Sequence, residues 1–148
     1  AADALVARMK KRIAAVVGAT TAKAAGKTVY HELSPDLYTA TSRTFVGRVY
    51  ALFGLVNVAD EADATGGGYP QLSAEYLVAG SPDLVVLADT VCCAQSRETV
   101  VARPGWDRVS AVRTGSIVRI DDSLASRWGP RVVDFVRAVG AALARFER

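Results

Sequence analysis

The chain has 148 residues, of which 51% are hydrophobic and 22% are charged, and its formal net charge is +3. This length and composition predict one folded domain with its own core and exclude a disordered chain. No apolar stretch approaches the roughly 20 residues that a membrane-spanning helix requires. The basic residues alternate with acidic ones instead of forming a stripe, which argues against a nucleic-acid partner.

The first residues have the apolar spacing of a helix. Leu5, Met9, Ile13 and Val16 recur at steps of three and four residues, and basic side chains occupy the other faces. The pattern starts almost at the first residue of this sequence, and we expect no cap before it. We therefore expect it to be the later part of a longer helix.

The next segments predict a strand, a helix and a second strand. Residues 27–32 are rich in β-branched and aromatic side chains, which is typical of a strand. Ser42 is expected to cap a helix over residues 43–53, and Gly54 would end it. A short strand is expected over residues 55–58.

An acidic, glycine-rich loop is expected over residues 60–68. Its three glycines, Gly66 to Gly68, are not followed by a phosphate-binding motif, so we interpret them as loop flexibility that lets the chain reach Tyr69. Ser73 is then placed to cap a short helix that extends to residue 79.

The remaining segments predict two more strands separated by a short helix. Residues 84–88 form a continuous apolar run, which indicates a strand covered on both faces. In chain order, we further expect a loop at 89–94, a helix from Ser96 to 102, a turn at 103–106, a strand at 116–120 and a helix at 130–146 with Pro130 in its first turn.

This alternation of strands and helices predicts an α/β fold with a parallel sheet between two layers of helices. Ligands of such sheets bind outside the carboxyl ends of the strands. The loops expected there span residues 33–41, 66–71, 89–95 and 121–127.

Few residues support a catalytic function. His31 is the single histidine, so a cluster of histidines cannot bind a metal within this chain, and no serine lies in a nucleophile-elbow motif. We interpret His31 as structural or solvent-facing, with contact to a ligand as the alternative.

Adjacent cysteines at Cys92 and Cys93 match neither the redox motif nor the zinc motif with two intervening residues. They leave three alternatives: two buried thiols, a vicinal disulfide, or a bridge to a segment outside this sequence. A small enzyme or redox domain that uses both sulfurs stays open as an alternative function.

Three motifs together resemble one family. They are residues 69–75 (YPQLSAE), 81–87 (SPDLVVL) and 126–131 (SRWGPR). Their order and spacing resemble the C-terminal lobe of the helical-backbone class, class III, of solute-binding proteins of ABC importers. The resemblance covers nearly the whole chain. It implies that residues 1–18 are the later part of the helix between two lobes and that residues 19–148 are the C-terminal lobe.

The resemblance also implies roles for individual residues. Tyr69 would present its ring to the ligand, Asp122 and Arg127 would line the same cleft, and Tyr38 is a plausible further contact, with Tyr30 and His31 less so. Glu75 matches the carboxylate that docks this lobe into an arginine pocket of the permease. From its position alone, Glu75 could equally serve the dipole of the helix that Ser73 caps.

The family implies a function in transport without chemistry. The expected ligand is a bulky metal chelate, a corrinoid such as cobalamin or a ferric siderophore more than haem, and no cofactor is expected. The partners would be the permease with its ATPase and the N-terminal lobe, and the location would be extracytoplasmic, periplasmic or as a cell-surface lipoprotein. A sensor or interaction domain on the same scaffold is a further alternative.

Overall fold

A four-stranded parallel sheet forms the centre of the molecule. The computed structural model describes residues 7–8, 10–18, 25–64, 66–120 and 132–144. The strands are β1 (Thr28–Glu32), β2 (Val56–Asn57), β3 (Leu84–Leu87) and β4 (Ile117–Arg119), in the spatial order β2-β1-β3-β4. All three neighbouring pairs are parallel. Because β2 and β3 lie on opposite sides of β1, the sheet has a topological switch point between β1 and β3.

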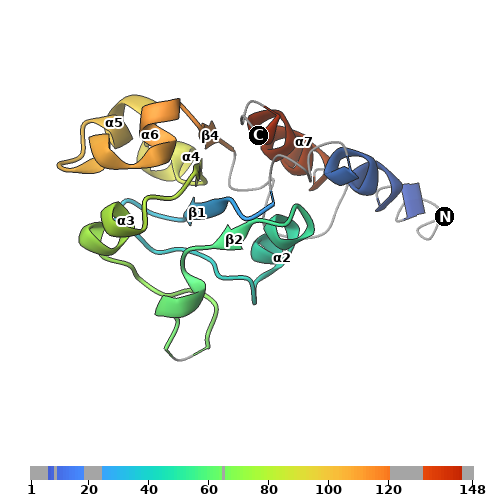
Figure 1. Ribbon diagram of the computed structural model, residues 1–148, viewed down its shortest axis with the longest axis horizontal. Coiled ribbons are helices and arrows are strands. Elements are labelled where there is room, and N and C mark those ends of the chain that lie inside the picture. The colour runs from blue at the N-terminus through green and yellow to red at the C-terminus, as the bar shows by residue number, and fades with distance from the viewer. Residues whose placement is uncertain (1–6, 9, 19–24, 65, 121–131, 145–148) are drawn as a thin grey trace.

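Helices cover both faces of this sheet. They are α2 (Phe45–Leu52), α3 (Ala74–Gly80), α4 (Thr90–Cys93), α5 (Arg97–Val101), α6 (Ser110–Thr114) and α7 (Val132–Leu143), with 3-10 turns η1 (Asp60–Ala62) and η2 (Trp106–Arg108). Residues 10–18 form an earlier helix. This first helix, α2 and α7 lie to one side of the sheet, and α3, α5 and α6 to the other (Figure 1). The predicted three-layer α/β fold is confirmed.

Alternating side chains of the central strands build two separate cores. Val29, Leu84 and Val86 pack with the apolar faces of the first helix, α2 and α7. Tyr30 and Val85 point the other way and pack with α3, η2 and α6. Every residue of β3 is buried, as expected for a strand between two helical layers.

The helix predicted over residues 43–53 begins later than expected. Thr44, and not Ser42, caps α2, because its side chain accepts a hydrogen bond from the amide of Gly47 at 3.0 Å. The hydroxyl of Ser42 instead donates to Asp60 at 2.7 Å. Both residues can cap a helix, and the contact with η1 decides between them.

Two short helices lie where no helix was predicted. The expected loop at residues 89–94 contains α4, and α6 lies in a stretch for which no helix was predicted. Helices of four and five residues are too short to show a helical period. The cap predicted at Ser73 is confirmed, since its side-chain oxygen accepts an amide hydrogen bond from the first turn of α3. Ser96, where a helix was expected to begin, caps α5 in the same way. Pro130 lies outside the described residues.

Gly68 is fixed by its surroundings, which at this residue corrects the interpretation of the three glycines as loop flexibility. Its amide donates to Asp63 at 2.8 Å, and its carbonyl accepts from Thr41 at 2.9 Å. Its φ of +92° lies in the region that side chains disfavour, and a Cβ there would lie 3.1 Å from a methyl carbon of Thr44. Gly68 is therefore required where the chain enters the segment of Tyr69.

We predict that Gly68→Ala lowers the free energy of unfolding by about 1–3 kcal/mol, because it strains the backbone at a positive φ. Urea unfolding followed by circular dichroism measures the change. Gly80→Ala is the matched control, since Gly80 has an ordinary φ and open space around its Cα. Equal stability of the Gly68 variant and the parent chain would contradict the assignment.

No helix in the described part of the chain combines the length and apolar character needed to cross a membrane.

Candidate functional site

Two loops pair along their backbones close to the carboxyl end of β1. Tyr38 and Gln71 form an antiparallel bridge. On either side of it, Thr39 donates to the carbonyl of Pro70 at 3.1 Å, and Leu72 donates to that of Leu37 at 3.0 Å. We call residues 37–41 and 68–72 the tyrosine ledge, because this pairing brings Tyr38 close to Tyr69.

Both tyrosines of the ledge are exposed, Tyr38 to 44% and Tyr69 to 60%. The backbone holds Tyr38 in place, since its carbonyl accepts from the amide of Leu33 at 2.9 Å. Leu37 has a φ of +72°, unusual for a residue with a side chain, and it closes the turn that begins at Ser34. Two exposed rings on a fixed backbone can pack against a flat or bulky ligand.

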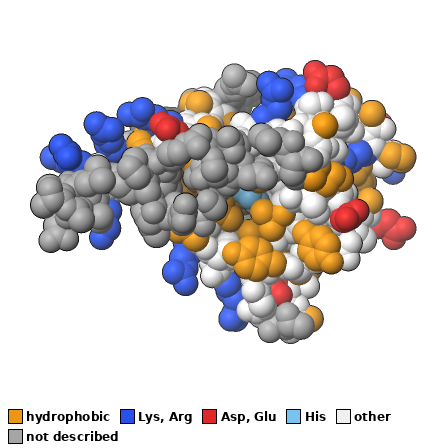
Figure 2. Space-filling model, turned by 180° about the vertical axis from the view of Figure 1, so that it is seen from behind, with side chains coloured by type: hydrophobic (Ala, Val, Ile, Leu, Met, Phe, Trp, Pro, Cys, Tyr) orange, Lys and Arg blue, Asp and Glu red, His pale blue; other side chains and the backbone are white. Residues whose placement is uncertain are grey.

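The single histidine lies beneath the surface. His31 is 1% exposed and shares a hydrogen bond with the hydroxyl of Tyr50 through its Nδ1. Burial lowers the pKa of His31 to about 4, so its ring is neutral at pH 7. Figure 2 shows the edge of this ring in pale blue, beside hydrophobic side chains that gather on that face of the molecule. These contacts agree with a structural role.

A buried ion pair lies at the carboxyl end of β1. Arg103 holds Glu32 with two hydrogen bonds of 2.6 and 2.8 Å, and Glu32 is fully buried. Arg103 also donates to Gln95 at 3.0 Å and lies 4.7 Å from the ring centre of Trp106. The hydroxyl of Tyr30 donates to Glu32 at 3.1 Å. Glu32 therefore anchors the segment that follows α5 to the sheet.

A second buried carboxyl group, Asp89, follows β3 directly. As an ionised group it would be unsatisfied, because neither of its carboxyl oxygens has a hydrogen-bond partner in the structure. Burial, first of all, and the nearby charge of Glu32 raise the pKa of Asp89 to about 8. Asp89 thus keeps its proton at neutral pH. The two carboxyl groups lie at the ends of β1 and β3, on either side of the switch point.

The other predicted site residues are placed only in part. Glu75 is exposed in the first turn of α3. Asp122 and Arg127 lie outside the described residues, so their place in the cleft stays a prediction. Cys93 is disulfide-bonded. The structure does not describe the side chain of Cys92. A disulfide between Cys92 and Cys93 therefore also stays a prediction.

The sequence did not single out Glu32, Asp89 or Arg103. Two signals were present, since Glu32 ends a predicted strand and Asp89 follows a fully apolar one. Arg103 gave no signal, because its partner Glu32 is 71 residues away in the chain. Among the described residues, no cluster of three or more His, Cys, Asp or Glu side chains could hold a metal ion.

Two cavities lie away from the tyrosine ledge. One, of about 570 Å³, lies between the first helix and α2, and Lys10 and Arg48 are among its lining residues. The other, of about 500 Å³, lies beside β4. Neither of these two cavities is lined by Tyr38 or Tyr69.

Asp89→Asn should change how stability depends on pH. The folded chain keeps a proton on Asp89 up to about pH 8, whereas the unfolded chain releases it near the ordinary value of 3.8. The free energy of unfolding therefore carries a contribution from Asp89 that falls as the pH rises from about 4 to about 8. Asparagine removes this contribution, so we expect the variant to gain stability relative to the parent chain over that interval.

Urea unfolding at pH 5 and pH 8 measures this difference. Asp107→Asn, at an exposed position of η2, is the control for replacing a carboxyl group by an amide. An Asp89 variant whose stability relative to the parent chain did not change with pH would refute the protonated state.

Comparison with known proteins gives a consistent family. A family model described as "Periplasmic binding protein" matches residues 1–124. An uncharacterized ABC transporter substrate-binding lipoprotein of Bacillus subtilis, YvrC, is 31% identical over 96% of this chain and 44% of its own length. A cobalamin-binding protein of Halobacterium salinarum is 31% identical over 90% of this chain and 37% of its own length.

A solved structure agrees in fold. The crystal structure of a possible iron-binding, periplasmic solute-binding protein from Staphylococcus epidermidis superimposes with a TM-score of 0.79, at 23% identity, over 97% of this chain and 55% of that chain. The chain spans less than half the length of the two curated relatives. The match of the family model to most of the chain confirms the resemblance, and the chain belongs to the extracytoplasmic periplasmic binding protein family.

Proposed function

We propose that this chain is the C-terminal lobe of a solute-binding protein that captures a bulky metal chelate and delivers it to an ABC importer. The tyrosine ledge carries the proposal, because it offers two exposed aromatic rings on a backbone fixed by hydrogen bonds. The partial coverage of longer relatives supports a second lobe that would close over it. The relative from Halobacterium, named for binding cobalamin, supports the ligand class.

Binding in this proposal needs no bond to be made or broken. The rings of Tyr38 and Tyr69 would cover the apolar faces of the ligand, and Asp122 and Arg127 would orient it through polar contacts. The rigid parallel sheet would keep the ledge in place while the two lobes close. Membership in a family of binding proteins supports this function over an enzyme that uses Cys92 and Cys93.

A corrinoid or a ferric siderophore suits this surface better than haem. Proteins commonly hold haem iron through an axial histidine, cysteine, methionine or tyrosine. His31 is buried and bound to Tyr50, so it does not reach the ledge surface. Tyr38 and Tyr69 are the exposed side chains of the ledge that could act as axial ligands.

The ligand class can be tested by titrating the complete two-lobed protein with cyanocobalamin, a ferric hydroxamate siderophore and haemin. We expect one of the first two to bind. Tyr69→Ala should weaken that binding at least tenfold, while Tyr69→Phe, which keeps the ring, should stay within about threefold of the parent protein.

Leu52→Ala is the control for this titration, because Leu52 is similarly exposed but lies on α2. Absence of binding to all three compounds would exclude the ligand class. A Tyr69 effect no larger than that of Leu52 would exclude the ledge as the binding surface.

We propose further that Glu75 docks this lobe onto the permease. Glu75 is exposed in the first turn of α3, where the hydroxyl of Ser73 already caps the amide of Tyr76 at 3.0 Å. The cap is thus complete without the carboxylate of Glu75. An exposed carboxylate that meets an arginine can fix the orientation of a transient complex without tight binding.

We expect Glu75→Gln in the complete protein to leave ligand affinity unchanged and to lower stimulation of the transporter ATPase several-fold. Glu98→Gln is the matched control, because Glu98 holds the same position after the capping Ser96 in α5. ATPase stimulation that is equal for the Glu75 variant and the parent protein would disprove the docking role.

A further inference from the structure

The outer edge of β4 has unpaired backbone groups. Ser116 accepts from the amide of Val85 at 3.1 Å, and Ile120 donates to the carbonyl of Leu87 at 3.0 Å. In a parallel pair, alternate residues of a strand turn their backbone groups toward the same neighbour. The register with β3 therefore leaves the N–H and C=O groups of Ile117 and Arg119 facing outward. No strand pairs with this side of β4 among the residues that the structure describes.

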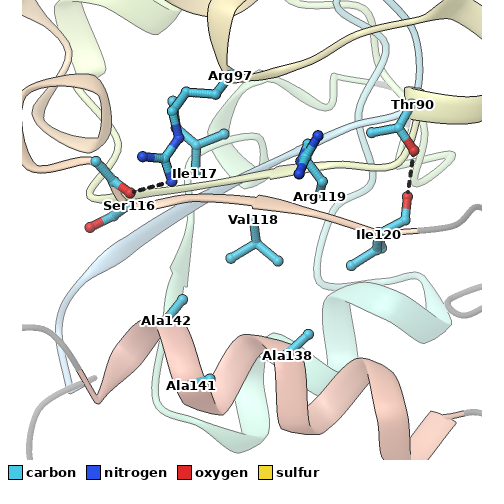
Figure 3. A pocket seen from close by; sticks show the side chains of 11 residues that line it. Thr90, Arg97, Ser116, Ile117, Val118, Arg119, Ile120, Ala138, Ala141 and Ala142 are labelled. Carbon is cyan, nitrogen blue, oxygen red and sulfur yellow. Dashed lines mark hydrogen bonds between the residues drawn. The ribbon is translucent and has the colours of Figure 1, made fainter.

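A groove of about 500 Å³ runs along this edge (Figure 3). The side chains that form it differ between its two sides. Ala138, Ala141 and Ala142 of α7 lie on one side together with Val118, so that wall consists of small apolar groups. Arg97 and Arg119 lie on the other side of β4. The groove thus combines an open strand edge, an apolar wall and a basic wall.

The basic wall is exposed and keeps a positive charge. Arg97 reaches across the start of β4 and donates to the carbonyl of Gly115 at 3.3 Å. Glu98 lies close enough to interact electrostatically with both arginines. Two guanidinium groups near one carboxylate leave a net charge of about +1 at this wall.

We propose that the outer edge of β4 binds an extended acidic peptide segment as an additional strand of the sheet. Such a segment would pair with the backbone of Ile117 and Arg119, as in other cases of strand addition. Successive side chains of a strand point to opposite faces. Acidic residues at alternate positions would therefore meet Arg97 and Arg119, while small apolar residues between them would meet the alanines of α7.

The same charges argue against a second copy of this chain as the partner. Pairing two β4 edges would bring two sets of Arg97 and Arg119 side chains together, and like charges across neighbouring strands are destabilising. A segment of three or four residues spans about 10–13 Å, which suffices to cover the three residues of β4. This proposal does not depend on the transport function.

The test uses the parent chain and two fluorescein-labelled, acetylated and amidated peptides, Glu-Val-Glu-Val-Glu and Lys-Val-Lys-Val-Lys. Fluorescence anisotropy should show binding of the acidic peptide and at least tenfold weaker binding of the basic one. Amide NMR shifts on binding should be largest at Ile117 and Arg119. Equal binding of both peptides, or of neither, would overturn the proposal.

Two variants separate strand pairing from charge attraction. Arg119→Ala removes one charge and should weaken binding about three- to tenfold. Arg119→Pro also removes the outward N–H, which none of the described strands uses, so we expect a further loss of at least fivefold. Arg108→Gln, at an exposed position outside the groove, should have no effect.

Equal affinities of the alanine and proline variants would show that the backbone takes no part and would overturn strand addition. A competition experiment with free glutarate tests whether the groove binds any small carboxylate. If glutarate displaced the acidic peptide at concentrations similar to the peptide itself, the groove would be a site for small carboxylates, and the proposal would fail.

Discussion

Burial of β1 and β3 on both faces is the constraint on which the rest of the structure depends. All four residues of β3 are buried, and β1 is buried from Val29 to Glu32. Helices must therefore pack on both sides of the sheet. Because all neighbouring strands are parallel, every connection must also cross from one end of the strands to the other. The loops that follow the strands are thereby collected at one edge, and the tyrosine ledge is built from two segments near that edge.

The same burial explains why charged carboxyl groups are unfavourable at this edge of the sheet. Glu32 and Asp89 sit where two buried strands end, so neither carboxyl group can be hydrated. Arg103 compensates Glu32 with two hydrogen bonds, but a buried ion pair contributes little net stability once desolvation is counted. The Arg103–Glu32 pair instead sets the position of the chain, because it holds the segment after α5 against β1. Asp89 has no such partner among the described residues and is accommodated by remaining protonated.

Patterns of neighbouring residues in the sequence predicted those parts of the fold that depend on neighbouring residues alone. The apolar run of β3, the serine cap of α3, the start of α5 at Ser96 and the apolar stripe of α7 were predicted from the sequence. The cap of α2 was not, because Ser42 and Thr44 are chemically equivalent until Asp60 binds one of them. The ion pair between Glu32 and Arg103 was also unreadable, since only the folded sheet brings its two members together.

The candidate site, too, could be predicted from the sequence only in part. Tyr38 and Tyr69 were identified by resemblance, but their proximity depends on backbone pairing between two loops that are distant in sequence. That pairing uses main-chain groups and the special conformations of Leu37 and Gly68, and it involves no side chain of the tyrosines themselves. The aromatic residues can therefore change while the ledge stays in place. A scaffold of this kind can present different surfaces to different ligands without altering its fold, which is a physical reason why one architecture can serve a family of binding proteins.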